Sequence, residues 1–383
     1  MRAQDDGVTQ RGRTPSHRRS PRRSRRRTGL VVLAILLAVG IVAGTLPPVQ
    51  VRLAAALTVA EALDLPVTRP FAPEVDRREH VAGGVEGVLY EPDGAPAPVV
   101  LLVPGAVPAG VDDRRVVQVA QAVARSGRQV FVPELEVYGE DLVTRDVERL
   151  VHASLALSEA APGGVALVGI SFGGSLALLA AADERLEGRV AVVATFGAYL
   201  DLVGVLQAAT TGEALVDGQR IAWDADPLAE TVVREHLTEL LPEEQRPAVL
   251  AVLAGEVEPD ALPPSVRAAY DLLVNDDPER TYVLAEQLPA EVRDRIAAVS
   301  PGSVTDRLES VPIVAMHAVD DPVIPYSELL RLGAALPHAQ LITLVSFDHV
   351  GLDAPSPRAW LRALGDLRQV WRFSTAVLDA GGG

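Results

Sequence analysis

From about residue 80 onward, two kinds of hydrophobic pattern alternate along the chain. Short continuous apolar runs suit strands that are buried on both faces of a parallel sheet, and segments with helical apolar spacing separate them. Strands are expected at 99–103, 129–132, 165–168, 189–195, 313–317 and 341–345, after an opening hairpin at 80–92. Helices are expected at 116–124, 143–157, 175–182 and 357–377. This alternation predicts an α/β fold with a doubly wound, mostly parallel sheet and right-handed crossovers.

A long block without strand pattern interrupts the alternation at residues 203–300. Its apolar residues recur at helical spacing in four stretches, at 231–241, 246–255, 265–274 and 289–299. Because a strand pattern returns afterwards, we expect a helical cap inserted between two late strands. The core is then predicted in two parts, at 79–202 and 301–383.

The N-terminal region divides into three segments of different character. Residues 1–28 are polar, contain ten arginines, and are expected to be disordered. Residues 29–46 carry no charge, and at about 1.5 Å per residue they would span roughly 27 Å, close to the thickness of a bilayer core. They predict one transmembrane helix, which Pro47 and Pro48 end. Residues 47–78 form a connector.

A cleaved signal peptide and a buried core helix are the alternatives to a membrane anchor. Signal peptides usually have an apolar region of about 7–15 residues, closely followed by a small-residue cleavage site. The run at 29–46 is longer, and the nearest such site, Ala54 to Ala56, lies beyond the two prolines. We therefore expect a single-pass protein of the cell membrane, with secretion after cleavage as the alternative.

Charge and composition exclude several classes of function. The net charge is −16, but residues 1–28 carry +8, so the rest of the chain carries −24. So acidic a body does not favour nucleic acid as a partner and should repel polyanionic substrates. The absence of cysteine excludes disulfides, thiolate catalysis and cysteine-based metal sites.

The acidic charge is concentrated in the predicted cap. Residues 203–310 hold 21 acidic residues and eight arginines. Together with apolar helix faces over the sheet edge, this predicts a small, neutral or cationic, partly apolar substrate. The sequence has no P-loop, G-x-G-x-x-G, H-E-x-x-H or EF-hand motif, so no cofactor and no metal ion is expected. The acidic pairs Asp276–Asp277 and Glu243–Glu244 are interpreted as solvated surface residues.

The most specific chemical signal is the motif Gly-Ile-Ser-Phe-Gly-Gly at residues 169–174. It lies between a predicted strand and a predicted helix, where G-x-S-x-G forms a strained turn that exposes the serine hydroxyl. Gly169 and Gly173 suit positions where a Cβ atom would collide with neighbouring backbone. Ser171 is therefore the predicted nucleophile, against the alternative of a glycine-rich turn with an exposed serine.

A nucleophilic serine needs a base, which should follow a later strand end. Of the two histidines after residue 321, His338 precedes the strand predicted at 341–345, and His349 follows it. His349 is therefore the predicted base, and His338 is interpreted as a solvated loop residue. His317, at a strand end, is assigned to packing or hydrogen bonding.

The base needs an orienting acid, and the tetrahedral intermediate needs two backbone N–H donors. Asp320 and Asp321 both follow the strand at 313–317, whereas Asp348 is excluded because it is adjacent to His349. Phe172, after the nucleophile, is one predicted oxyanion donor. The other is Ala106, with Val107 as second choice, because the neighbouring prolines of the turn at 104–108 have no N–H.

Over residues 80–202 and 301–372 the chain resembles the α/β-hydrolase superfamily of esterases, lipases, dienelactone-hydrolase-like enzymes and related peptidases. The matching segments are 99–106, 168–174, 318–325 and 347–350. The resemblance implies a triad of Ser171, Asp321 and His349, because members commonly carry G-x-x-D before a Val/Ile-Pro pair. Ala318 stands at the place of that glycine, and Pro104-Gly105 replaces the His-Gly found in many members.

The resemblance implies a serine hydrolase that cleaves carboxylic esters through an acyl-enzyme, and the uncharged run 29–46 predicts that it is anchored in a membrane. An acyltransferase or a peptidase on the same triad is an alternative within that chemistry. A tethered binding domain that retains the fold without catalysis is an alternative outside it.

The arginines that precede residues 29–46 predict the orientation of the chain, because positively charged flanks stay in the cytoplasm. The N-terminus should be cytoplasmic and the catalytic body extracytoplasmic. A C-terminal alkaline phosphatase fusion should therefore be active and a C-terminal GFP fusion dark. The reverse pair of results would overturn this orientation.

Overall fold

The computed structural model describes residues 54–56, 58, 74–93, 98–107, 109–136, 144–227, 238–345 and 357–380. Its strands are β1 (Val75–Ala82), β2 (Val85–Pro92), β3 (Val99–Val103), β4 (Gln129–Pro133), β5 (Val165–Ile170), β6 (Val190–Phe196), β9 (Ile313–Ala318) and β10 (Gln340–Leu344). They form one eight-stranded sheet in the order β1-β2-β4-β3-β5-β6-β9-β10. Only β2 runs antiparallel to its neighbours β1 and β4, and all other pairs are parallel.

The central strands are apolar throughout because both of their faces are covered. All five residues of β3 are buried. Leu101 contributes to the hydrophobic cluster on one side, and its neighbours Val100 and Leu102 contribute to the cluster on the other. The sheet thus separates two hydrophobic cores, as the continuous apolar runs predicted.

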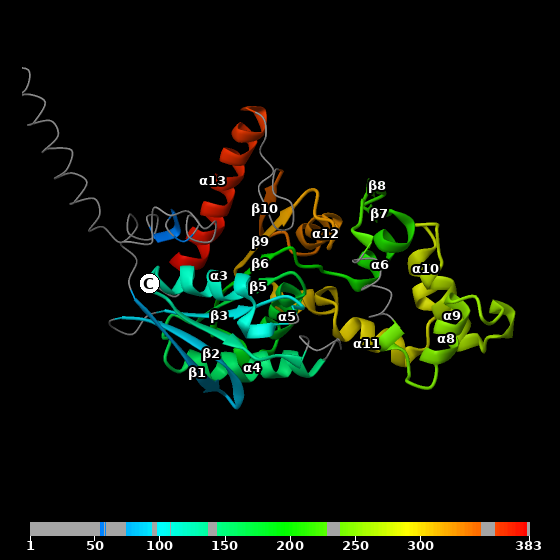
Figure 1. Cartoon of the computed structure of the whole chain (residues 1–383), viewed down its shortest axis with the longest axis horizontal. Helices are drawn as coiled ribbons and strands as arrows, with labels where there is room; N and C mark the ends of the chain where they lie inside the picture. The colour runs from blue at the N-terminus through cyan, green and yellow to red at the C-terminus, as the bar shows by residue number, and fades with distance from the viewer. Residues whose placement is uncertain are drawn as a thin grey trace, which may run out of the picture. The chain divides into compact units, whose positions relative to one another are not determined.

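Helices cover both faces of the sheet, which confirms the predicted doubly wound α/β architecture (Figure 1). The core helices are α3 (Arg114–Ala124), α4 (Thr144–Ser158), α5 (Phe172–Ala181), α12 (Ser327–Ala335) and α13 (Pro357–Asp379). Apolar residues of α3 and α13 belong to one core, and those of α4, α5 and α12 belong to the other. Short 3-10 helices, η2 (Gly110–Asp112) and η4 (Glu184–Leu186), lie between core elements.

The insertion between β6 and β9 contains more than the helices that the sequence predicted. Its helices are α6 (Leu202–Thr211), α8 (Arg246–Leu253), α9 (Pro264–Leu273), α10 (Thr281–Glu286) and α11 (Ala290–Ala298), with 3-10 helices η5 (Pro259–Ala261) and η6 (Pro301–Leu308). A hairpin of β7 (Glu213–Val216) and β8 (Gln219–Ala222) follows α6. Asp217 and Gly218, at its turn, have φ angles of 49° and 76°. An Asp-Gly pair is typical of hairpin turns, so the sequence contained a signal for this hairpin that the prediction did not use.

Three further differences from the sequence prediction have local causes. β1 begins at Val75, inside the predicted connector 47–78, and its residues are mostly exposed, so this edge strand has little apolar signal. Helix α12 was not predicted, although its apolar residues have helical spacing. Helix α5 begins at Phe172, directly after the predicted nucleophile, rather than at residue 175.

The predicted transmembrane helix at 29–46 lies outside the described residues. Within the part of the chain that the structure describes, no helix is long and apolar enough to cross a membrane. Most of the helix predicted at 231–241 also lies outside, since the description resumes at residue 238.

Candidate active site

Ser171 occupies a strained turn between β5 and α5. Its φ and ψ angles are 53° and −131°, a conformation that non-glycine residues rarely adopt. Its N–H donates to the Phe196 carbonyl at 2.7 Å, and its own carbonyl accepts from the Gly174 N–H at 2.9 Å. These bonds hold the strained backbone between the end of β6 and the first turn of α5, and strain of this kind persists only where the surroundings determine it.

Close backbone contacts explain the glycines of the motif. A Cβ atom on Gly169 would lie 2.4 Å from the Gly174 Cα atom. A Cβ atom on Gly173 would lie 2.2 Å from the Pro104 carbonyl oxygen. Both contacts are too short for any side chain, so only glycine permits this turn. The steric role that the sequence predicted for Gly169 and Gly173 agrees with these contacts.

The turn after β3 lies directly against the nucleophile. A Cβ atom on Gly105 would be 3.1 Å from the Ser171 Cβ atom and 3.6 Å from its Oγ atom. The predicted oxyanion donors therefore flank Ser171: Phe172 follows it in the chain, and Ala106 follows the glycine packed on it. Their donation to an oxyanion stays a prediction.

Asp321 and Asp320, the two candidate acids, differ sharply in burial. Asp320 is exposed, whereas Asp321 is 1% exposed. The Asp321 Oδ1 atom accepts the N–H groups of Val323 at 2.9 Å and Ile324 at 3.0 Å. These bonds orient the Asp321 carboxylate within its loop.

Asp321 lies at the same edge of the sheet as Ser171. Gly197, directly after β6, is so close that a Cβ atom on it would lie 3.3 Å from the Asp321 Oδ2 atom. The preceding residue, Phe196, accepts the Ser171 N–H. The end of β6 therefore lies between the predicted nucleophile and the predicted acid.

The histidines are placed as follows. His349 lies outside the described residues, but its segment follows β10, whose Leu344 carbonyl accepts the Val319 N–H at 2.8 Å next to the acid loop. His338 is exposed, with its Nε2 atom 3.0 Å from the Val311 carbonyl oxygen before β9. Buried His317 has Nε2 2.9 Å from the Ile324 carbonyl oxygen and 3.6 Å from Asp321 Oδ2. His338 and His317 thus have the solvated and structural positions that the sequence predicted.

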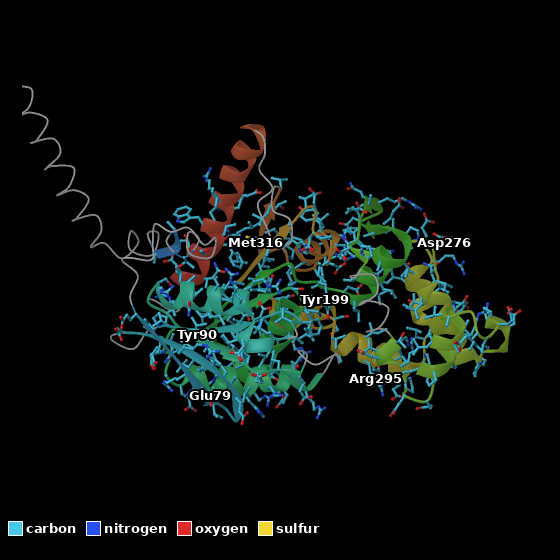
Figure 2. The ribbon with its side chains drawn as sticks, in the orientation of Figure 1. Glu79, Tyr90, Tyr199, Asp276, Arg295 and Met316 are labelled. Atoms are coloured by element: carbon cyan, nitrogen blue, oxygen red, sulfur yellow. The ribbon has the colours of Figure 1, made fainter. Side chains whose placement is uncertain are left out.

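A buried carboxylate that the sequence analysis missed holds the loop between β6 and α6. The Glu328 Oε2 atom accepts the N–H groups of Leu200 and Asp201, at 3.0 and 2.9 Å. In the same loop, Tyr199 accepts from the Ser175 hydroxyl at 2.8 Å and donates its N–H back to that oxygen (Figure 2 shows Tyr199). This loop begins at Gly197, next to the Asp321 carboxylate, and Tyr199 binds it to Ser175 of α5. Glu328 therefore holds a loop that contacts both the predicted acid and the helix after the predicted nucleophile.

The charge of Glu328 is set by burial and by its neighbours. Its complete burial raises its pKa to about 7. The Arg331 guanidinium, with Nε 3.1 Å from Oε1, lowers that pKa, and the nearby Asp201 carboxylate raises it. Desolvation has the largest effect, so the folded protein favours the neutral acid relative to the unfolded chain.

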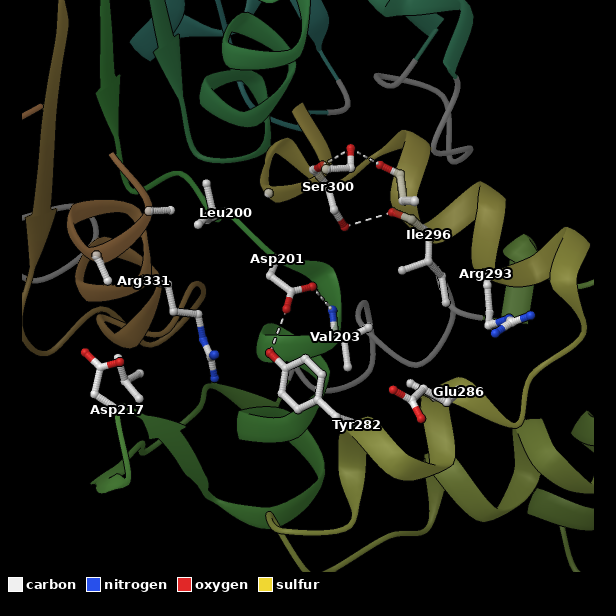
Figure 3. Close-up of a pocket in the computed structure, with 17 residues that line it drawn as sticks. Leu200, Asp201, Val203, Asp217, Tyr282, Glu286, Arg293, Ile296, Ser300 and Arg331 are labelled. Carbon is white, nitrogen blue, oxygen red and sulfur yellow. Dashed lines mark hydrogen bonds between the residues drawn. The ribbon is translucent and has the colours of Figure 1, made fainter. Parts of the chain in front are cut away.

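A separate cavity of about 650 Å³ opens beside this loop (Figure 3). The Tyr282 hydroxyl donates to Asp201 Oδ2 at 2.6 Å there, and burial raises the pKa of Tyr282. Asp201 Oδ1 accepts the Val203 N–H at 3.0 Å and so caps α6. Neither Ser171 nor Asp321 lines this cavity.

Of the four acidic residues of the insertion predicted to be solvated, three are exposed, and Asp277 is half-buried and accepts the Glu279 N–H. Asp276, Glu243 and Glu244 are exposed, and Figure 2 shows Asp276. Among the residues that the structure describes, no group of three or more histidine, cysteine, aspartate or glutamate residues could hold a metal ion.

Comparison with known proteins gives matches to solved structures at low sequence identity. No family model matches the sequence, and no curated protein matches it significantly. The chain is similar to an acylaminoacyl peptidase from Pyrococcus horikoshii, with a TM-score of 0.44 and 14% identity over 76% of this chain. It spans only 40% of the length of that peptidase.

Two further solved structures match over most of their own length. One is brefeldin A esterase, a bacterial homologue of human hormone sensitive lipase, with a TM-score of 0.47 and 17% identity over 88% of both chains. The other is an alpha/beta hydrolase from Penicillium, with a TM-score of 0.44 and 16% identity over 78% of this chain and 99% of that chain.

Burial separates the two candidate acids in a testable way. Asp321→Asn keeps an oxygen for the two amides but weakens its hold on a histidine, so ester hydrolysis should fall by about 10⁴. Asp320→Asn, at an exposed site, should stay within about tenfold of wild type. If steady-state kcat values showed the opposite order, Asp320 would be the acid.

Glu328 should make stability depend on pH. Because its pKa is raised from 4.5 to about 7, its contribution is fully present below pH 4.5 and is lost as the pH rises through 7. That loss amounts to about 3 kcal/mol. Urea midpoints at pH 5 and pH 8 should therefore show Glu328→Gln gaining on wild type as the pH rises. Glu309→Gln, at an exposed carboxylate, is the matched control. An equal difference at both pH values would contradict the assignment.

Proposed function

We propose that the chain is a membrane-anchored serine hydrolase with an α/β-hydrolase fold that cleaves carboxylic esters. One observation carries the proposal: Ser171 is held at a φ angle of 53° in the turn between β5 and α5, with the turn after β3 packed on its side chain. A strained serine at this place on a parallel sheet has its hydroxyl presented for nucleophilic attack. The buried, oriented Asp321 at the same sheet edge supports it.

In the proposed reaction, the Ser171 Oγ atom attacks the ester carbonyl while His349 takes its proton. The N–H groups of Phe172 and Ala106 stabilise the developing oxyanion, where a helix N-terminus also favours negative charge. His349 then protonates the leaving alcohol, and Asp321 keeps the ring in the orientation that both transfers need. Water, activated by His349, releases the acid from Ser171.

The substrate class is inferred from the charge of the insertion. Residues 203–310 carry 21 acids against eight arginines, and apolar residues of this segment belong to the hydrophobic cluster that also contains Phe172. A net negative charge on this segment lowers the concentration of anions near it. The proposed substrate is therefore a small, neutral or cationic, partly apolar ester. Residues 29–46 are proposed as the anchor that keeps the enzyme at the membrane.

Replacement of the nucleophile tests the proposal directly. In the full-length protein, Ser171→Ala should lower kcat for p-nitrophenyl esters by about 10⁶ and abolish labelling by a fluorophosphonate probe. Ser310→Ala, at an exposed serine far along the chain, should behave like wild type. A Ser171→Ala variant that retained more than about a tenth of the activity would refute the site.

The same assay tests the substrate class. A neutral ester should be hydrolysed faster than an analogue of the same length that bears a carboxylate, and added salt should narrow the gap by screening. A faster carboxylate ester would contradict the proposed class. Transfer of the acyl group to added alcohols, in place of water, would identify an acyltransferase instead.

A further inference from the structure

The loop that carries Asp321 is bound from outside the core by the segment after β8. The Trp223 indole N–H donates to the main-chain carbonyl oxygen of Asp321 at 2.7 Å. The Asp226 N–H donates to the next carbonyl, that of Pro322, at 2.9 Å. The insertion thus supplies hydrogen-bond donors to two consecutive carbonyls of the acid loop.

The acid loop needs such donors. Its N–H groups at Val323 and Ile324 are used by the Asp321 carboxylate itself, and Pro322 has no N–H. The carbonyls of Asp321 and Pro322 therefore find their partners in another part of the chain, because main-chain carbonyls need hydrogen bonds when they leave water. The direction of the carboxylate follows from the position of this backbone.

Trp223 is itself held in place by contacts with the core. Its main-chain N–H donates to the Gly212 carbonyl at 2.8 Å, and its half-buried ring packs against the main hydrophobic cluster. The preceding hairpin is attached through Leu215, which accepts from Arg331 at 2.7 Å and donates to the buried Gln207 at 2.8 Å. Core helix α12 and helix α6 of the insertion thereby fix the hairpin, and the hairpin fixes the indole.

From these contacts we infer that Trp223 is a positioning residue for the catalytic acid. This inference rests on the proposed function. The insertion then has a role beyond covering the sheet edge, because its first hairpin holds the loop from which Asp321 orients His349. A displacement of about 1 Å at such a group can cost on the order of 100-fold in rate.

Trp223→Phe tests the inference, because it keeps an aromatic ring and removes the indole N–H donor. In the full-length protein, kcat for p-nitrophenyl acetate should fall about tenfold, with KM within about twofold of wild type. Arg220→Ala is the matched control on the same hairpin, since Arg220 forms exposed ion pairs with Glu213 and Glu279 and does not reach the acid loop. It should leave kcat unchanged.

A double-mutant cycle distinguishes positioning from general support of the fold. In an Asp321→Ala background, Trp223→Phe should cause no further loss, because its effect passes through the missing carboxylate. An undiminished loss in that background, or an unchanged kcat in the single variant, would overturn the inference. If Trp223→Phe does not fold, Asp226→Pro removes the second donor at an exposed residue and is read in the same way.

The activity of the wild-type protein distinguishes a failure of the positioning role from a failure of the proposed hydrolase function. An active wild type with a fully active Trp223→Phe variant removes the positioning role and leaves the hydrolase. A wild type that neither hydrolyses esters nor reacts with a fluorophosphonate removes both.

Discussion

The close approach of three backbone segments around Ser171 is the constraint on which the candidate site depends. The turn after β3, the turn after β5 and the start of α5 approach so closely that Gly169 and Gly173 have no room for a Cβ atom. The same approach forces Ser171 into a positive φ angle. Backbone strain of this kind costs of order 1–3 kcal/mol and persists only where the surroundings over-determine it. Here the hydrogen bonds to β6 and within α5 do so.

The loop between β6 and α6 connects the nucleophile turn to the other groups of the candidate site. It passes the Asp321 carboxylate at Gly197, bonds Ser175 of the nucleophile helix through Tyr199, and ends on the Glu328 carboxylate. Ionising a buried carboxyl group costs desolvation free energy, which the two amides and Arg331 offset in part. Glu328 on α12 orders the loop that lies between the predicted nucleophile and the predicted acid.

The insertion combines two physical roles. Its hairpin supplies donors to the acid loop, and its acidic residues are the basis for the proposed preference for neutral or cationic substrates. The hairpin lies directly after α6, so Trp223 follows soon after the end of β6 in the sequence. The helices α8 to α11 follow further along the chain and contribute apolar residues to the main core cluster.

The features that the sequence alone determined are formed by residues that are neighbours in the chain. The run Val99–Val103 indicated a strand covered on both faces, and the residues 169–174 indicated a strained turn, because neighbours in the chain contain the whole pattern. The choice between Asp320 and Asp321 came only from a resemblance, and burial now favours Asp321. The contacts of Glu328 and Trp223 were decided by tertiary structure alone. Their partners lie 128 and 98 residues away, and no periodicity or motif links a side chain to a main-chain group that only the folded sheet brings near.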